Sequence, residues 1–147
     1  MKKVLYSIAA IMTAVSCTST NPFLAEWDTP YGIPDFGAVK EKHYLEAVEA
    51  GIAQQEAEIN AIISNTEEPT FANVVEAYER SGAILDRVVG VLFNLSETDG
   101  TDSMQKIVEE VLPKFSVHSD NIFMNPAFFA KVEALYNKME SLELNRE

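Results

Sequence analysis

The sequence predicts an all-α fold of about four antiparallel amphipathic helices that follow an extended N-terminal arm. Three observations support this: apolar residues recur at steps of three and four from about Lys42, polar breaks separate four such segments, and no stretch alternates with period two. Short connections favour antiparallel neighbours. The 147 residues suffice for one domain, and the 47% of apolar residues suffice for a core.

Residues 1–16 have the pattern of a bacterial export signal. A basic start precedes an apolar stretch from Val4 to Val15, which is too short to span a bilayer permanently. The only cysteine, Cys17, follows a small residue, as in a lipobox, where the cysteine becomes the lipidated N-terminus. Lipoboxes more often carry leucine where Ala14 stands, so ordinary signal cleavage and an idle or buried thiol stay open as alternatives.

These features predict an exported protein of the bacterial cell envelope, anchored to the membrane by a lipid at Cys17, as a periplasmic or outer-membrane lipoprotein. Removal of the signal takes away two lysines and no acids, which changes the formal net charge from −12 to −14. Nucleic-acid binding needs clustered basic residues, so we expect no nucleic-acid partner. A lone cysteine also cannot form an internal disulfide.

Residues 17–41 are predicted to form an extended arm. Three prolines and two glycines fall within about twenty residues, so the segment cannot continue a helix. The arm is too apolar for a free linker, and we expect it to pack against the body of the protein. Its large apolar residues are Phe23, Leu24, Trp27, Tyr31, Ile33 and Phe36.

The remainder, residues 42–147, is predicted to be one helical domain. A first apolar stripe runs from Leu45 to Ile63 and ends before Pro69, and Thr70 is a plausible N-cap for the next helix. The second stripe runs from residue 71 to residue 95. It passes Ser81 and Gly82, whose small size would let a neighbouring helix approach closely.

Two further helices complete the predicted domain. The third stripe covers residues 104–123, with Thr101 or Asp102 as its cap, and Pro113 is expected to kink or divide it. The fourth covers residues 126–142, with Asn125 as N-cap and proline at the first helical position.

The two histidines of the chain do not predict a metal site. His43 and Glu46 share one helical turn, but they supply two ligands, whereas a catalytic zinc needs three protein ligands and an open position. His118 falls on the third apolar stripe, and we interpret it as a core histidine bonded to a backbone carbonyl. The sequence also lacks His-Glu-x-x-His, a Gly-rich phosphate loop, Cys-x-x-Cys and Gly-x-Ser-x-Gly. We therefore predict no catalytic residue, no metal ligand and no cofactor bound by this chain.

Five motifs nevertheless resemble one known family in order and spacing, and together they cover nearly all of residues 21–137. The motifs are "NPFL…TPYGIPDF", "HYLEAVEAGI", "PTFANVVEAYERSG", "DRVVGVLFNL" and "HSDNIFMNPAFFAKV". They resemble the N-terminal part of bacterial peptidyl-dipeptidases and oligopeptidase A, zinc metallopeptidases of the thimet-oligopeptidase family.

The resemblance implies a place in a larger, almost wholly helical peptidase. The N-terminal helices of such enzymes belong to the lobe that walls the substrate channel and admits short peptides. Zinc is held further along the chain by His-Glu-x-x-His and a downstream glutamate, and neither His43 nor His118 matches a catalytic position. Residues 1–147 alone are thus expected to be an inactive scaffold, whose partner is the C-terminal catalytic region of the same protein.

Three explanations compete for the length of the chain: a fragment of a longer gene product, a truncated gene, and a free-standing domain. We favour the first two, because the export signal and the helical start are present and only later parts of the pattern are missing. The alternative function is a free-standing, non-catalytic helical lipoprotein that binds a peptide or a protein partner.

Overall fold

The computed structural model describes residues 21–139, and every regular element in this range is helical. The all-α prediction is therefore confirmed. The predicted export signal, residues 1–16, and the lipidation site Cys17 lie outside the described residues. The elements are η1 (Pro30–Gly32), α1 (Lys42–Ser64), η2 (Phe71–Glu76), α2 (Ala77–Glu79), α3 (Ala83–Thr98), α4 (Asp102–Phe123) and α5 (Pro126–Tyr136).

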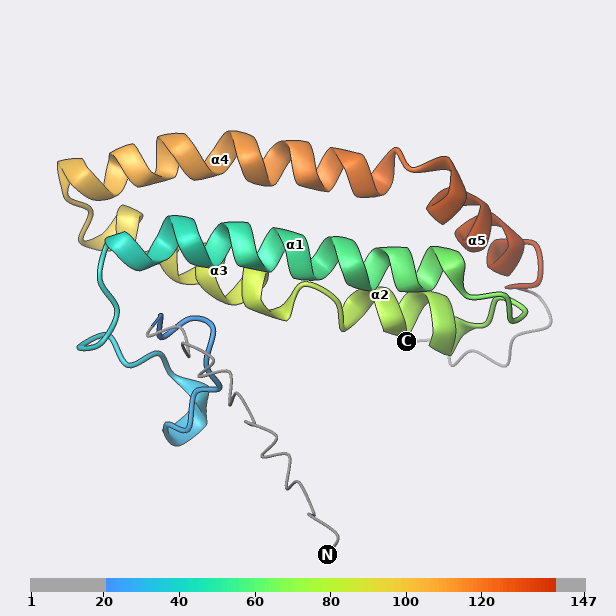
Figure 1. Cartoon of the computed structure of the whole chain (residues 1–147), viewed down its shortest axis with the longest axis horizontal. Helices are drawn as coiled ribbons and strands as arrows, with labels where there is room; N and C mark the ends of the chain where they lie inside the picture. Colours follow the sequence, from blue (N-terminus) through green and yellow to red (C-terminus); the bar gives the residue numbers. More distant parts are fainter. Residues whose placement is uncertain (1–20, 140–147) are drawn as a thin grey trace, which may run out of the picture.

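Helix α1 is the centre of the molecule (Figure 1). α3 packs along one side of α1 and runs antiparallel to it. α4 lies along another side of α1 and runs parallel to it. η2 and α2 cover the C-terminal half of α1, and α5 closes the same end of the bundle. Consecutive long helices are thus antiparallel, as predicted.

Two clusters of buried side chains form the core. The larger one joins the arm, α1, α3 and α4, and its fully buried members include Tyr44, Val48, Leu92 and Val111. The smaller one lies between the C-terminal half of α1, the end of α4 and α5. Its buried members are Ile59, Ile62, Ile122 and Phe128.

The arm packs on the bundle through its first described residues and through Val39, which belongs to the same buried cluster as Phe23. Phe23 is fully buried, and its ring centroid lies 5.1 Å from that of Tyr44 in α1. Arg87 of α3 lies over the Trp27 ring at 4.6 Å and donates a hydrogen bond to the carbonyl oxygen of Ala25 (2.8 Å). The expected packing is wrong for the middle of the arm, where three large apolar side chains are exposed: Tyr31, Ile33 and Phe36.

The helix starts follow from local capping. Thr70 accepts a hydrogen bond from the backbone N–H of Asn73 (3.2 Å), and the Asn73 side chain accepts one from the N–H of Thr70 (2.7 Å). Thr101 caps α4 through the N–H of Met104 (3.2 Å). Asn125 accepts from two backbone N–H groups at the start of α5. Each cap satisfies donors that the first turn leaves unpaired, which fixes where the helix begins.

The second predicted helix is interrupted, which corrects the prediction of one continuous segment. Its first turns are π-helical η2 and short α2, and a turn then separates them from α3. Gly82 in this turn has φ +74°, a left-handed conformation that only glycine adopts without a steric penalty. The pair Ser81-Gly82 therefore ends one helix and starts another.

Pro113 does not divide the third predicted helix, because α4 continues through it as one element. Proline removes one backbone N–H and crowds the preceding turn. Pro113 and Glu109, whose carbonyl loses its partner, are both on the exposed face, where water can bond that carbonyl.

Candidate functional site

His43 lies in the first turn of α1 and bonds the segment that precedes the helix. Its ring Nδ1 accepts a hydrogen bond from the backbone N–H of Lys40 at 3.0 Å, and the side chain is buried. The side-chain amide of Asn21 donates to the carbonyl oxygen of His43 (2.8 Å) and to Glu46 Oε2 (3.1 Å). Asn21 therefore attaches the arm to the first turns of α1 through the His43 carbonyl and the Glu46 carboxylate.

His118 lies in a side-chain network that joins three elements. Its Nε2 is 2.8 Å from Oε1 of Gln55 in α1, and Nε2 of Gln55 donates to Oγ of Ser81 at 3.3 Å. Ser81 in turn donates to the carbonyl oxygen of Tyr78 at 2.7 Å. Because the Gln55 amide donates to Ser81, its oxygen is left to accept, and His118 carries its proton on Nε2. The predicted bond to a backbone carbonyl is thus wrong: the partner is a side chain.

The other nitrogen of His118 faces a carboxylate. Nδ1 lies 3.8 Å from Oε1 of Glu56 and has no hydrogen-bond partner among the described residues. This distance is too long for a hydrogen bond. Glu56 and His118 together offer two groups, fewer than the three that a protein zinc site uses.

A small cavity of about 90 Å³ brings Ser119, His118 and Asp86 to one place, but they do not form a nucleophilic triad. His118 uses Nε2 for Gln55, and adjacent residues of a helix such as His118 and Ser119 do not face each other. Burial and the nearby Glu79 raise the pKa of Asp86. A raised pKa alone is compatible with a structural role, so the cavity supports no assignment of catalysis.

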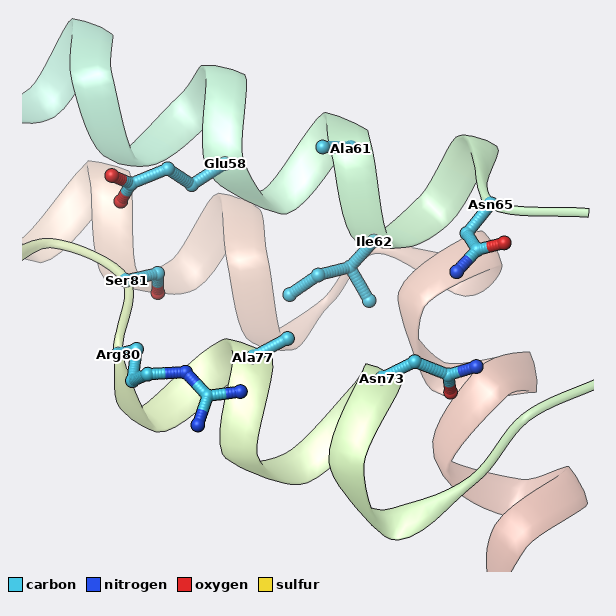
Figure 2. A pocket seen from close by; sticks show the side chains of 8 residues that line it. All are labelled: Glu58, Ala61, Ile62, Asn65, Asn73, Ala77, Arg80 and Ser81. Carbon is cyan, nitrogen blue, oxygen red and sulfur yellow. The ribbon is translucent and has the colours of Figure 1, made fainter. Parts of the chain in front are cut away.

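A polar hollow of about 400 Å³ lies between α1 and the η2–α2 segment (Figure 2). In Figure 2, Ile62 points from α1 into the hollow, while Glu58 reaches towards the turn that contains Ser81. Glu58 Oε2 accepts from the N–H of Gly82 (2.7 Å), and Arg80 pairs with Glu76 (3.1 Å). The charged groups around the hollow are thus already used to hold the turn between α2 and α3.

A second concavity is apolar, and we call it the apolar groove. It has a volume of about 280 Å³ and runs between η2–α2 on one side and α5 with the end of α4 on the other. Seven side chains line it: Val74, Val75, Tyr78, Phe123, Phe128, Phe129 and Val132. Tyr78 is its only lining residue with a polar atom in the side chain, and no charged residue lines it.

The described part of the chain offers no fit for the zinc ion that the family resemblance implies. Residues 21–139 contain no group of three or more histidine, cysteine, aspartate or glutamate side chains that could hold a metal ion. Each histidine instead has a structural partner. Within the same range, no helix is both long enough and apolar enough to cross a bilayer.

Sequence reasoning missed Gln55 and Glu56 as the partners of His118. They lie about sixty positions earlier on another helix, and no spacing rule connects them. Ser81 and Gly82 were singled out for their small size, and the structure shows what packs there: the Gln55 amide lies 2.5 Å from where a Cβ of Gly82 would stand.

Comparison with known proteins identifies relatives but no matching family model. The chain is 36% identical over 129 residues to the dipeptidyl carboxypeptidase of Salmonella typhimurium, and 35% identical over 130 residues to that of Escherichia coli. Each match covers 88% of this chain and 19% of the relative. Oligopeptidase A of Salmonella typhimurium is 23% identical over 123 residues, which are 84% of this chain and 16% of the relative.

The chain therefore spans about a fifth of the length of the curated relatives that it matches. An identity above one third over 88% of the chain cannot arise from shared helical composition alone. This chain is homologous to a segment of the dipeptidyl carboxypeptidases and, more distantly, of oligopeptidase A.

Proposed function

We propose that this chain forms the N-terminal helical scaffold and part of the substrate-channel wall of an exported zinc metallopeptidase that removes dipeptides from short peptides. The observation that carries the proposal is the 35–36% identity to two dipeptidyl carboxypeptidases over 88% of the chain. The all-helical architecture agrees with it. In this proposal the substrates are short peptides, and they meet the scaffold through the channel of the longer protein.

The scaffold role fits the chemistry of the described residues. Both histidines and the buried polar side chains around them connect helices to each other, to the arm or to a turn. Such groups stabilise a fixed arrangement of α1, α3 and α4, which is what a channel wall requires. Zinc and the groups that activate water would belong to the other four fifths of the protein, and no catalytic step is assigned to this chain.

We place the protein in the cell envelope, held to a membrane by a lipid on Cys17. The basis is the export pattern of residues 1–16 and the small residue before the cysteine. Cell fractionation would test this. Wild-type protein should sediment with membranes and Cys17→Ser protein should not, whereas an unchanged membrane fraction for the variant would contradict lipidation.

The activity is tested with the polypeptide that the gene encodes, read to its own stop codon. We expect an in-frame His-Glu-x-x-His beyond codon 147 and release of a dipeptide from the C-terminus of an N-terminally blocked hexapeptide, detected by mass spectrometry. A chelator should abolish the release and added zinc should restore it. A stop codon directly after codon 147 with a stable, monodisperse product would favour the free-standing helical lipoprotein instead.

A further inference from the structure

We propose that the apolar groove between η2–α2 and α5 receives the apolar face of a helix from the part of the longer polypeptide that lies outside the matched segment. This inference rests on the proposed function, because it requires that the chain be a segment of a larger peptidase. It goes further by assigning the surface through which the scaffold contacts the rest of the protein.

The groove exposes large aromatic side chains to solvent. Phe123 and Phe129 are 63% and 58% exposed, and they lie in one concavity beside partly exposed Val132. A contiguous apolar patch of this kind marks a contact surface rather than scattered exposed residues. Its floor is shared with the core, since Phe128 lines the groove and belongs to the smaller buried cluster.

The lining selects between possible occupants. A peptide substrate carries charged ends and a polar backbone, so a site that holds it supplies polar groups to orient it. The groove has none with charge, and Tyr78 is its only lining residue with a polar atom in the side chain. A helix that belongs to the same protein needs only an apolar stripe that fits between two facing helices. The chemistry of the groove therefore favours a structural element over a substrate.

The walls of the groove are held in place before any occupant arrives. Lys131 of α5 donates a hydrogen bond to the carbonyl oxygen of Asn65 at the end of α1, and Lys138 pairs with Glu68 in the following loop. The two walls also contact each other, because the ring of Tyr78 in α2 packs edge to face against that of Phe123 in α4 with centroids 6.0 Å apart. A preformed groove reduces the entropic cost of docking.

The relatives supply the additional chain. The matched segment is only 19% of each dipeptidyl carboxypeptidase, so in those proteins it is covalently linked to a much longer partner. α5 is the last helix of the described range and forms one wall of the groove. Sequence that follows α5 in a longer polypeptide thus starts beside the groove, where the effective concentration of a docking helix is high.

Cysteine labelling of the polypeptide read to its own stop codon tests the inference. In a Cys17→Ser background, single cysteines replace Phe129 in the groove or Val117 on α4 outside it, which are 58% and 59% exposed in this chain. We expect maleimide to react with Phe129→Cys at least about tenfold more slowly than with Val117→Cys, because a covered thiol reacts only when the structure opens. In urea the two rates should become equal. If Phe129→Cys does not fold, Val132→Cys replaces it.

Equal labelling of the two positions in the folded protein would overturn the inference, and so would a gene that ends at codon 147 and leaves the groove thiol reactive. Protection that disappears on dilution would identify a second copy as occupant, and protection that needs added peptide would identify a substrate site; both results contradict the assignment. The peptidase assay separates the two proposals. Protection of the groove thiol without peptide hydrolysis would support the docking surface and contradict the proposed function. Hydrolysis without protection would support the proposed function and contradict the docking surface.

Discussion

The side chain of Gln55 connects α1, α4 and the turn between α2 and α3. Its oxygen accepts from His118, its nitrogen donates to Ser81, and its amide fills the space over Gly82. Buried polar groups of this kind contribute little when all are paired but cost stability when one partner is removed. The network therefore specifies how the helices meet, although it performs no chemistry.

Removing the Gln55 side chain should destabilise the protein. Gln55→Ala leaves the Nε2–H of buried His118 without its acceptor, and we expect a loss of about 1–3 kcal/mol in the free energy of unfolding. The matched control is Gln54→Ala, because the neighbouring Gln54 is exposed and bonds only Glu58 (2.8 Å). Urea unfolding followed by circular dichroism measures both. Equal midpoints for the two variants would show that the network contributes nothing.

Asp86 should make stability depend on pH. Burial and the negative charge of Glu79 raise its pKa in the folded state above the ordinary value of 3.8. The folded state thus disfavours the ionised form. The cost is absent below pH 3.8, appears as pH rises through that value, and is complete once pH exceeds the raised pKa.

Asp86→Asn is accordingly expected to raise the unfolding midpoint at pH 7. It should have little effect well below pH 3.8, where Asp86 is protonated in both the folded and the unfolded protein. Asp102→Asn is the matched control, because Asp102 occupies the first turn of α4 as Asp86 occupies the first turn of α3. The control should lose the favourable interaction with the helix N-terminus and lower the midpoint at pH 7. Thermal melts at pH 7 and well below pH 3.8 show whether each substitution raises or lowers the unfolding midpoint. A lowered midpoint for Asp86→Asn at pH 7 would refute the argument.

At the scale of the element, the break between α2 and α3 depends on Gly82. Alanine there would take a left-handed conformation at a cost of roughly 1–2 kcal/mol, and its Cβ would also displace Gln55. Gly90 within α3 is the control, since a Cβ there meets no atom within 4 Å. Gly90→Ala should stabilise the helix by about 0.5–1 kcal/mol. In a denaturant titration, the unfolding midpoint should therefore fall for Gly82→Ala and rise for Gly90→Ala. Midpoints that shift in the same direction would contradict the assigned turn.

The starts of η2, α4 and α5 could be predicted from sequence because their capping is local. Thr70, Thr101 and Asn125 each bond a backbone N–H two or three residues ahead, so the residue type and its position suffice. The break at Gly82 was missed although Ser-Gly is a recognised turn signal. The apolar stripe continues on both sides of it, and periodicity alone does not show a change in backbone handedness.

Tertiary contacts were less predictable. Close approach of two helices was expected at Ser81 and Gly82, but α1 and α3 also meet at Gly51, where a Cβ would lie 2.9 Å from the backbone of Leu85. The arm shows the same limit: Phe23 is buried and Tyr31 is exposed, although both are aromatic residues between prolines. Which of them finds a partner depends on residues more than twenty positions away. The His118 network has the same origin, so the candidate site could not be assembled from sequence spacing.

At the scale of the whole molecule, the proposed scaffold role is supported by the packing of the bundle and by homology to longer peptidases. The bundle has two core clusters that both include side chains of α1, and its histidines have structural partners. It matches about a fifth of the length of two dipeptidyl carboxypeptidases. Peptide hydrolysis by zinc requires at least three protein ligands at one site, and the described residues do not assemble them. Under the proposed function, this chain supplies the scaffold and the remainder of a longer protein supplies the chemistry.

The most direct test is a peptidase assay of purified residues 18–147 with an N-terminally blocked hexapeptide in the presence of added zinc. The account predicts no release of dipeptide above the buffer control, with no difference on addition of a chelator, while the protein keeps a helical circular dichroism spectrum. Zinc-dependent turnover that the chelator abolishes would contradict the central claim that the catalytic site lies outside this chain.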